Sequence, residues 1–130
     1  MRDGSRRIPV PAPMAVARVA AGLVFMGFGA AKFLNHATEA ASFRTYGLPL
    51  PDEFVYAIGA VEIVGGLLLI LGLATRLAAL VLAADMVGAI AVSGIKEGEP
   101  ISLTLAPALL VIMLLLVRSN PEVHSGAYKD

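Results

Sequence analysis

The sequence has no cysteine, and it has few charged residues. Without cysteine, the chain has no disulfide, no thiolate metal site and no dithiol redox pair of its own. Asp, Glu, Lys and Arg make up 15% of the residues, whereas about a quarter is usual in soluble domains. The formal net charge is zero and no dense basic stretch occurs, which argues against nucleic acid as a partner.

Hydrophobic residues dominate what is present: they form 58% of the 130 residues, and the mean hydropathy is +0.81. Most charges lie outside the long apolar segments. This distribution is typical of a small polytopic membrane protein. We expect one compact membrane domain at 14–118 and no attached soluble catalytic module.

Four apolar segments are long enough to be transmembrane helices, because about 20 residues at ~1.5 Å per residue cross ~30 Å of hydrocarbon. We predict an all-α fold, an antiparallel bundle of four membrane-spanning helices, with a short extra helix at about 37–46. The first apolar run is longer than the core of a usual signal peptide, so we interpret it as a retained helix. The predicted helices are approximately 13–34, 53–73, 76–95 and 100–118.

Basic residues near the predicted membrane ends indicate the orientation. We place the tails 1–13 and 119–130 in the cytoplasm of a bacterial inner (plasma) membrane and the loop 35–52 outside. The cytoplasmic side then carries Arg2, Arg6, Arg7, Arg18, Arg76, Arg118 and Lys129, and the other side carries Lys32, Arg44 and Lys96.

Small residues four apart on a membrane helix allow a neighbouring helix to approach closely. Gly27 with Ala31 and Ala84 with Gly88 have this spacing, and Gly65-Gly66 lies within the second span. We predict that these six residues make helix contacts.

Four ionisable residues lie inside the predicted spans: Arg18, Lys32, Glu62 and Asp85. At ~1.5 Å per residue, Glu62 lies roughly 16 Å and Asp85 roughly 14 Å from the cytoplasmic ends of their helices. If the two carboxyl groups face each other, both cannot remain ionised. Side chains lean toward the N-terminus of their helix, so we predict a Lys32–Glu62 pair on the outer side and an Arg18–Asp85 pair on the inner side.

Three interpretations of this polar intramembrane cluster remain open. The pairs fix the register of the helices; they line a polar cavity that binds a headgroup or relays protons; or the side chains face lipid and reach toward the interface. No Ser-His-Asp set, phosphate loop or metal cluster is visible. The residues therefore assign no catalytic group and no metal ligand, and they leave open whether the chain is an enzyme.

Five stretches of the sequence form a recognisable set of motifs: Gly22-Leu23-Val24-Phe25, Gly29-Ala30-Ala31-Lys32-Phe33, Gly47-Leu48-Pro49, Glu62-Ile63-Val64-Gly65-Gly66-Leu67-Leu68-Leu69-Ile70-Leu71-Gly72 and Thr75-Arg76. Together they resemble the DoxX family of four-helix bacterial inner-membrane proteins, over about residues 14–118. The resemblance implies a membrane component of redox or stress complexes, since relatives are similar to part of a thiosulfate:quinone oxidoreductase or to a membrane partner of superoxide dismutase and a sulfurtransferase.

Three functions are consistent with these features. The first is a membrane subunit of a redox or respiratory complex, with a quinone headgroup near Lys32, Glu62 and Asp85 and no covalently bound cofactor. The second is a non-catalytic accessory or assembly subunit of a larger complex. The third is a small transporter or lipid-handling protein. The partners expected are the lipid bilayer and other subunits or further copies of the chain.

Overall fold

The structure is a computed structural model that describes residues 12–119. Its regular structure is helical, with no strand in this range. Four stretches are long and apolar enough to cross a membrane: α2, α4, α5 together with η1, and α6. The predicted fold class is confirmed. The elements are α2 (Ala12–Leu34), α3 (His36–Thr45), α4 (Pro51–Leu71), α5 (Thr75–Ala89), the π-helix η1 (Ile90–Lys96) and α6 (Pro100–Ser119).

The helix ends differ from the predicted ones by a few residues at the loops. α4 ends at Leu71 instead of 73, because Gly72 adopts a left-handed conformation with φ of 74°. The N–H of Gly72 donates to Leu69 O, and that of Leu73 donates to Leu68 O; such bonds commonly close a helix at a glycine. Of the predicted tails, 1–11 and 120–130 lie outside the described residues.

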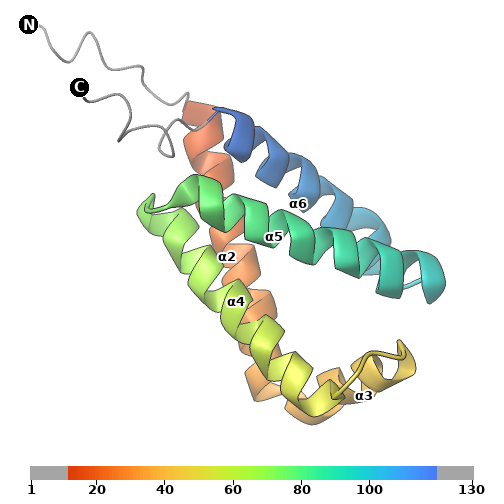
Figure 1. Cartoon of the computed structure of the whole chain (residues 1–130). Coiled ribbons are helices and arrows are strands. Elements are labelled where there is room, and N and C mark those ends of the chain that lie inside the picture. Colours follow the sequence, from red (N-terminus) through yellow and green to blue (C-terminus); the bar gives the residue numbers. More distant parts are fainter. Residues whose placement is uncertain (1–11, 120–130) are drawn as a thin grey trace, which may run out of the picture.

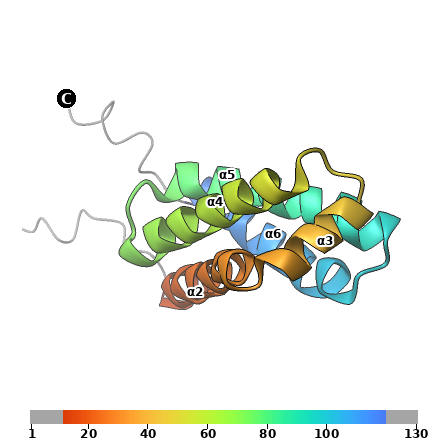
Figure 2. The same cartoon turned by 90° about the horizontal axis from the view of Figure 1, so that it is seen from below.

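The four long helices form two antiparallel pairs. α2 packs along α4, and α5 packs along α6 (Figure 1). The pairs meet at the end of the molecule that holds the α4–α5 turn and diverge toward the opposite end. There α3 lies between the separated ends, as the view from below also shows (Figure 2). The molecule is therefore a wedge.

Glycines set the close contact between α2 and α4. A Cβ added at Gly29 would lie 2.5 Å from the carbonyl oxygen of Gly59, and one added at Gly66 would lie 2.5 Å from that of Gly22. Real Cβ atoms are essentially never found at this separation. The two backbones therefore touch at two levels, seven residues apart on each helix, as small residues permit in membrane helices.

The apolar core lies where the two pairs meet. Leu82 of α5 contacts α4 at Gly65, where an added Cβ would be 3.1 Å from the leucine side chain. Leu69 and Met113 are fully buried beside it. The long helices also present apolar side chains outward, as a lipid environment requires. Examples of these exposed side chains are Val16, Leu23, Leu67, Leu77 and Val111.

The helix-packing predictions are partly wrong. Gly65 and Gly66 do pack against neighbouring helices, but added Cβ atoms at Gly27 and Gly88 would meet nothing within 4 Å. Ala31 and Ala84 line a cavity. The four-residue spacing identified small residues, but it did not tell which face of each helix meets a neighbour.

Candidate functional site

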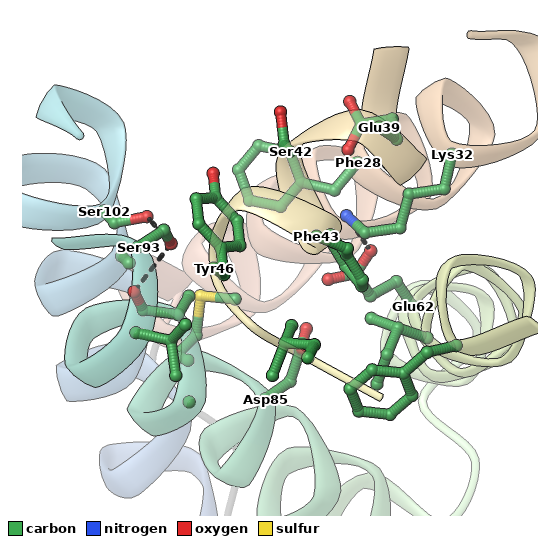
Figure 3. A pocket seen from close by; sticks show the side chains of 18 of the residues that line it. Phe28, Lys32, Glu39, Ser42, Phe43, Tyr46, Glu62, Asp85, Ser93 and Ser102 are labelled. Atoms are coloured by element: carbon green, nitrogen blue, oxygen red, sulfur yellow. Dashed lines mark hydrogen bonds and ion pairs between the residues drawn. The ribbon is translucent and has the colours of Figure 1, made fainter. Parts of the chain in front are cut away.

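The diverging helix pairs leave a cavity of about 690 Å³ between them, which we call the wedge cavity. Residues of α2, α3, α4, α5, η1 and α6 line it, and most of its wall is apolar. Figure 3 shows polar side chains at several places on this wall. One group lies beside α2, α4 and α5, another lies beside η1 and α6, and α3 and its end add Glu39, Ser42 and Tyr46. A mostly apolar cavity with a few convergent polar groups is the usual form of a small-molecule site.

Lys32, Glu62 and Asp85 form the first group, which we call the charged pole. Lys32 Nζ lies 2.9 Å from Glu62 Oε1, so the structure brings together the pair that the sequence suggested. Glu62 is only 2% exposed. The pair lies just beyond the Gly29–Gly59 contact, where a Cβ at Gly59 would be 3.0 Å from that of Lys32. Close backbone packing thus holds the cation over the carboxylate.

Asp85 reaches the same place from α5. Its carboxyl group interacts with Glu62 and Lys32, and all three residues line the wedge cavity (Figure 3). Its buried Oδ2 atom has no hydrogen-bond partner among the described residues. Two carboxyl groups therefore share one cation, and one carboxyl oxygen is available to a bound molecule.

Arg18 does not join Asp85, so the predicted inner pair is wrong. Its guanidinium donates a hydrogen bond to Leu69 O at 2.6 Å, near the end of α4. Gly72 leaves room for it, because an added Cβ there would be 2.8 Å from the guanidinium nitrogen. α2 packs chiefly on α4, and a helix C-terminus attracts cations through its exposed carbonyls. Arg18 therefore binds the C-terminal end of α4 and not the carboxyl group of Asp85.

Ser93, Ser102 and Glu99 form the second group, which we call the hydroxyl pole. The Ser93 and Ser102 hydroxyl oxygens are 2.7 Å apart, and the Ser93 hydroxyl is 2.8 Å from Ala89 O. Both serines are buried and line the wedge cavity. Ser93 belongs to η1, and π-helical turns frequently occur at functional sites. Sequence analysis missed this pole, since isolated serines carry no motif.

Glu99 caps the start of α6. Its carboxylate accepts hydrogen bonds from the backbone N–H groups of Ser102 at 2.8 Å and Ile101 at 3.1 Å. Burial raises the pKa of Glu99, but these bonds, with the Ser102 side chain, outweigh burial and hold the pKa below its ordinary value. The charged form is therefore favoured by folding.

We expect Glu99→Gln to remove a pH-dependent part of the stability. Because folding lowers the pKa of Glu99, its contribution is present above the ordinary glutamate pKa and is lost as the pH falls through the lowered value. A cap of this kind contributes about 1 kcal/mol. Thermal unfolding in detergent at pH 7 and at pH 3 should show a stability gap between wild type and variant that is smaller at pH 3. Glu97→Gln, at an exposed neighbour, should show no gap, and an equal gap at both pH values would contradict the assignment.

α3 is attached to the elements on both sides of the cavity. The His36 ring stacks on Tyr56 of α4 with centroids 4.0 Å apart, and its Nε2 atom is 3.3 Å from Asp52 Oδ1. Lys96 of η1 donates to Tyr46 O at 2.9 Å. His36 is the first residue of α3 and is half-buried.

Comparison with known proteins gives one family and two informative relatives. The sequence model of the DoxX family matches residues 14–94. The chain is 40% identical over 84 residues to "Uncharacterized membrane protein Rv3486" of Mycobacterium tuberculosis, covering 64% of this chain and 52% of that protein. It is 37% identical over 73 residues to "Putative oxidoreductase CatD" of Bacillus subtilis, covering 56% and 53%. The chain thus spans about half the length of these curated relatives. No solved structure matches significantly.

Proposed function

This chain belongs to the DoxX family of membrane proteins, and on that premise we propose that it is a membrane subunit of a redox complex that binds a quinone headgroup in the wedge cavity. A relative named as an oxidoreductase supports the redox association. The observation that carries the proposal is the charged pole inside a mostly apolar cavity of about 690 Å³.

A quinone headgroup has the chemistry that this cavity suits. Its ring is flat and apolar, and its oxygen atoms need hydrogen-bonding groups away from water. The side chains of Phe28, Phe43 and Phe54 line the cavity and offer ring contacts, while Lys32, Glu62 and Asp85 offer a cation and two carboxyl groups. Ionisable groups within a membrane are costly and commonly mark sites of ion, proton or ligand handling.

In this proposal the chain supplies binding and proton exchange. Lys32 compensates the charge of the carboxyl groups, and Glu62 and Asp85 exchange protons with the headgroup oxygen at their side of the cavity. Other subunits of the complex supply and remove electrons. The proposal places the chain in a bacterial inner membrane with both termini in the cytoplasm, so the wedge cavity opens in the outer half of the bilayer.

The test is Glu62→Gln in the purified full chain. Glutamine keeps an oxygen that accepts from Lys32, so the fold should persist, but the side chain can no longer take up a proton. We expect binding of a decyl-1,4-benzoquinol, whose O–H can donate to the carboxylate, to weaken about tenfold, the equivalent of one lost interaction with a charged group, and quinone-coupled activity of the intact complex to fall. Val64→Ala, at an exposed apolar position of the same helix, is the matched control.

The opposite result would favour the second function named above, a non-catalytic accessory or assembly subunit of a larger complex. If Glu62→Gln leaves quinol binding and quinone-coupled activity unchanged, or if the wild-type chain binds neither quinol nor quinone, the proposed site is wrong. Identification of quinone and of proteins that co-purify in mild detergent would then show which subunits the chain assembles with.

A further inference from the structure

Both poles of the wedge cavity present hydrogen-bond acceptors, and in the described part of the chain the hydroxyl pole has no cation beside them. Each serine hydroxyl carries one proton. If Ser93 donates to Ala89 O, then Ser102 donates to Ser93; if Ser93 donates to Ser102, then Ser102 turns to Glu99, which its side chain also reaches. In either arrangement both protons are used within the protein, and the hydroxyl pole offers lone pairs to a ligand.

Glu99 adds to this acceptor character. Its carboxylate accepts hydrogen bonds from two backbone N–H groups at the start of α6 and has no proton to donate. It lines the wedge cavity together with the two serines. Within the described residues, no positively charged side chain lines this end of the cavity.

The charged pole has one cation for two carboxyl groups. Lys32 Nζ lies 2.9 Å from Glu62 Oε1, and Asp85 Oδ2 is a buried acceptor with no hydrogen-bond partner within 12–119. A ligand that donates a hydrogen bond satisfies this oxygen, whereas a carbonyl oxygen facing it leaves two acceptors unpaired. An unpaired buried polar group costs about 1–3 kcal/mol.

We infer that the wedge cavity selects the reduced, two-hydroxyl form of the headgroup: one quinol O–H donates to Asp85 or Glu62 and the other donates to the Ser93–Ser102 pair. Figure 3 shows these two groups of side chains on different sides of the space between them. The inference rests on the proposed quinone-binding function and adds to it the redox form that binds and the residues that receive its second hydroxyl. At the charged pole a quinone carbonyl can still accept from Lys32, but at the hydroxyl pole its other carbonyl oxygen meets acceptors, and the quinone is therefore held more weakly.

The experiment compares three probes on the purified full chain without oxygen: decyl-1,4-benzoquinol, its dimethyl ether and the corresponding quinone. The dimethyl ether keeps the ring and the oxygens but lacks both O–H donors. We expect the quinol to bind at least about tenfold more tightly than the ether, the factor that follows from loss of two ordinary hydrogen bonds, and several-fold more tightly than the quinone, which loses the bond at the hydroxyl pole. This comparison uses the unaltered protein, so it does not depend on the folding of a variant.

A variant then locates the second hydroxyl. Ser102→Ala should reduce the preference for quinol over quinone several-fold. Thr104→Ala is the matched control, since Thr104 is an exposed hydroxyl of the same helix that bonds only to Pro100 O. Ser93→Ala should also reduce the preference for quinol over quinone, because the two serine hydroxyl groups are hydrogen-bonded to each other.

The outcomes separate the two proposals. If quinol, ether and quinone bind equally well, the selection is wrong while the binding function stands. If a preference for quinol is present but unaffected by both serine variants, the hydroxyl pole is not its source and this inference is overturned. If none of the probes binds, the proposed function fails and the inference fails with it.

Discussion

Gly29→Ala is expected to destabilise the folded protein by about 3 kcal/mol, the upper part of the range for overpacking. The added methyl group would lie 2.5 Å from Gly59 O and 2.6 Å from the side chain of Ile63. A side chain can move aside, but a backbone carbonyl in a helix cannot move without its helix. α2 and α4 must therefore separate, and unfolding in mixed detergent micelles should occur at clearly lower denaturant.

Gly27→Ala is the matched control two residues earlier on the same helix. Nothing lies within 4 Å of an added Cβ at this position, and alanine favours a helix over glycine by about 1 kcal/mol. This variant should be neutral or slightly more stable. Equal stability of the two variants would contradict the α2–α4 contact as the structure has it.

The fold could be predicted from the sequence because long apolar segments, and not single residues, indicate it. Four apolar runs of about 20 residues leave few alternatives to membrane-spanning helices, and short connections make neighbours antiparallel. The structure confirms these helices with shifts of a few residues at their ends. Exact ends depend on local conformations, such as the left-handed Gly72, which hydropathy does not report.

Which face of a helix meets its neighbour was harder to infer. The glycines that touch α4 are Gly22 and Gly29, and their partners are Gly66 and Gly59. Both pairs are separated by seven residues, so two turns of helix lie between the contacts. That spacing is visible in the sequence, but the more familiar four-residue spacing led to Gly27 instead.

Only the charged pole of the candidate site could be predicted from the sequence; the hydroxyl pole could not. A charge in an apolar run is conspicuous, so Lys32, Glu62 and Asp85 were evident, and the depths of Glu62 and Asp85 placed these two at the same level. Ser93 and Ser102 were not evident, because serines are common in membrane helices. Their meeting depends on the π-helical turn of η1 and on the approach of Gly94 to Ser102 O, where an added Cβ would be 3.1 Å away.

Lys32→Met is expected to destabilise the protein by about 3–5 kcal/mol, because it removes the cation that compensates two buried carboxyl groups. Methionine has a similar length, so packing around the aliphatic stem of Lys32 is preserved. Unfolding in mixed detergent micelles at neutral pH measures the change. Lys96→Met, which removes an exposed lysine bonded only to Tyr46 O, should cost less than about 1 kcal/mol.

The double variant Lys32→Met with Glu62→Gln tests whether the loss comes from the charge. Neutralising Glu62 removes the buried carboxylate that Lys32 compensates directly, so most of the stability lost in Lys32→Met should return, leaving a deficit of about 1–2 kcal/mol. If the two substitutions simply add, Lys32 and Glu62 do not interact in the folded protein. The charged pole would then not exist as a unit, and the wedge cavity would lose the groups on which both of its proposed roles depend.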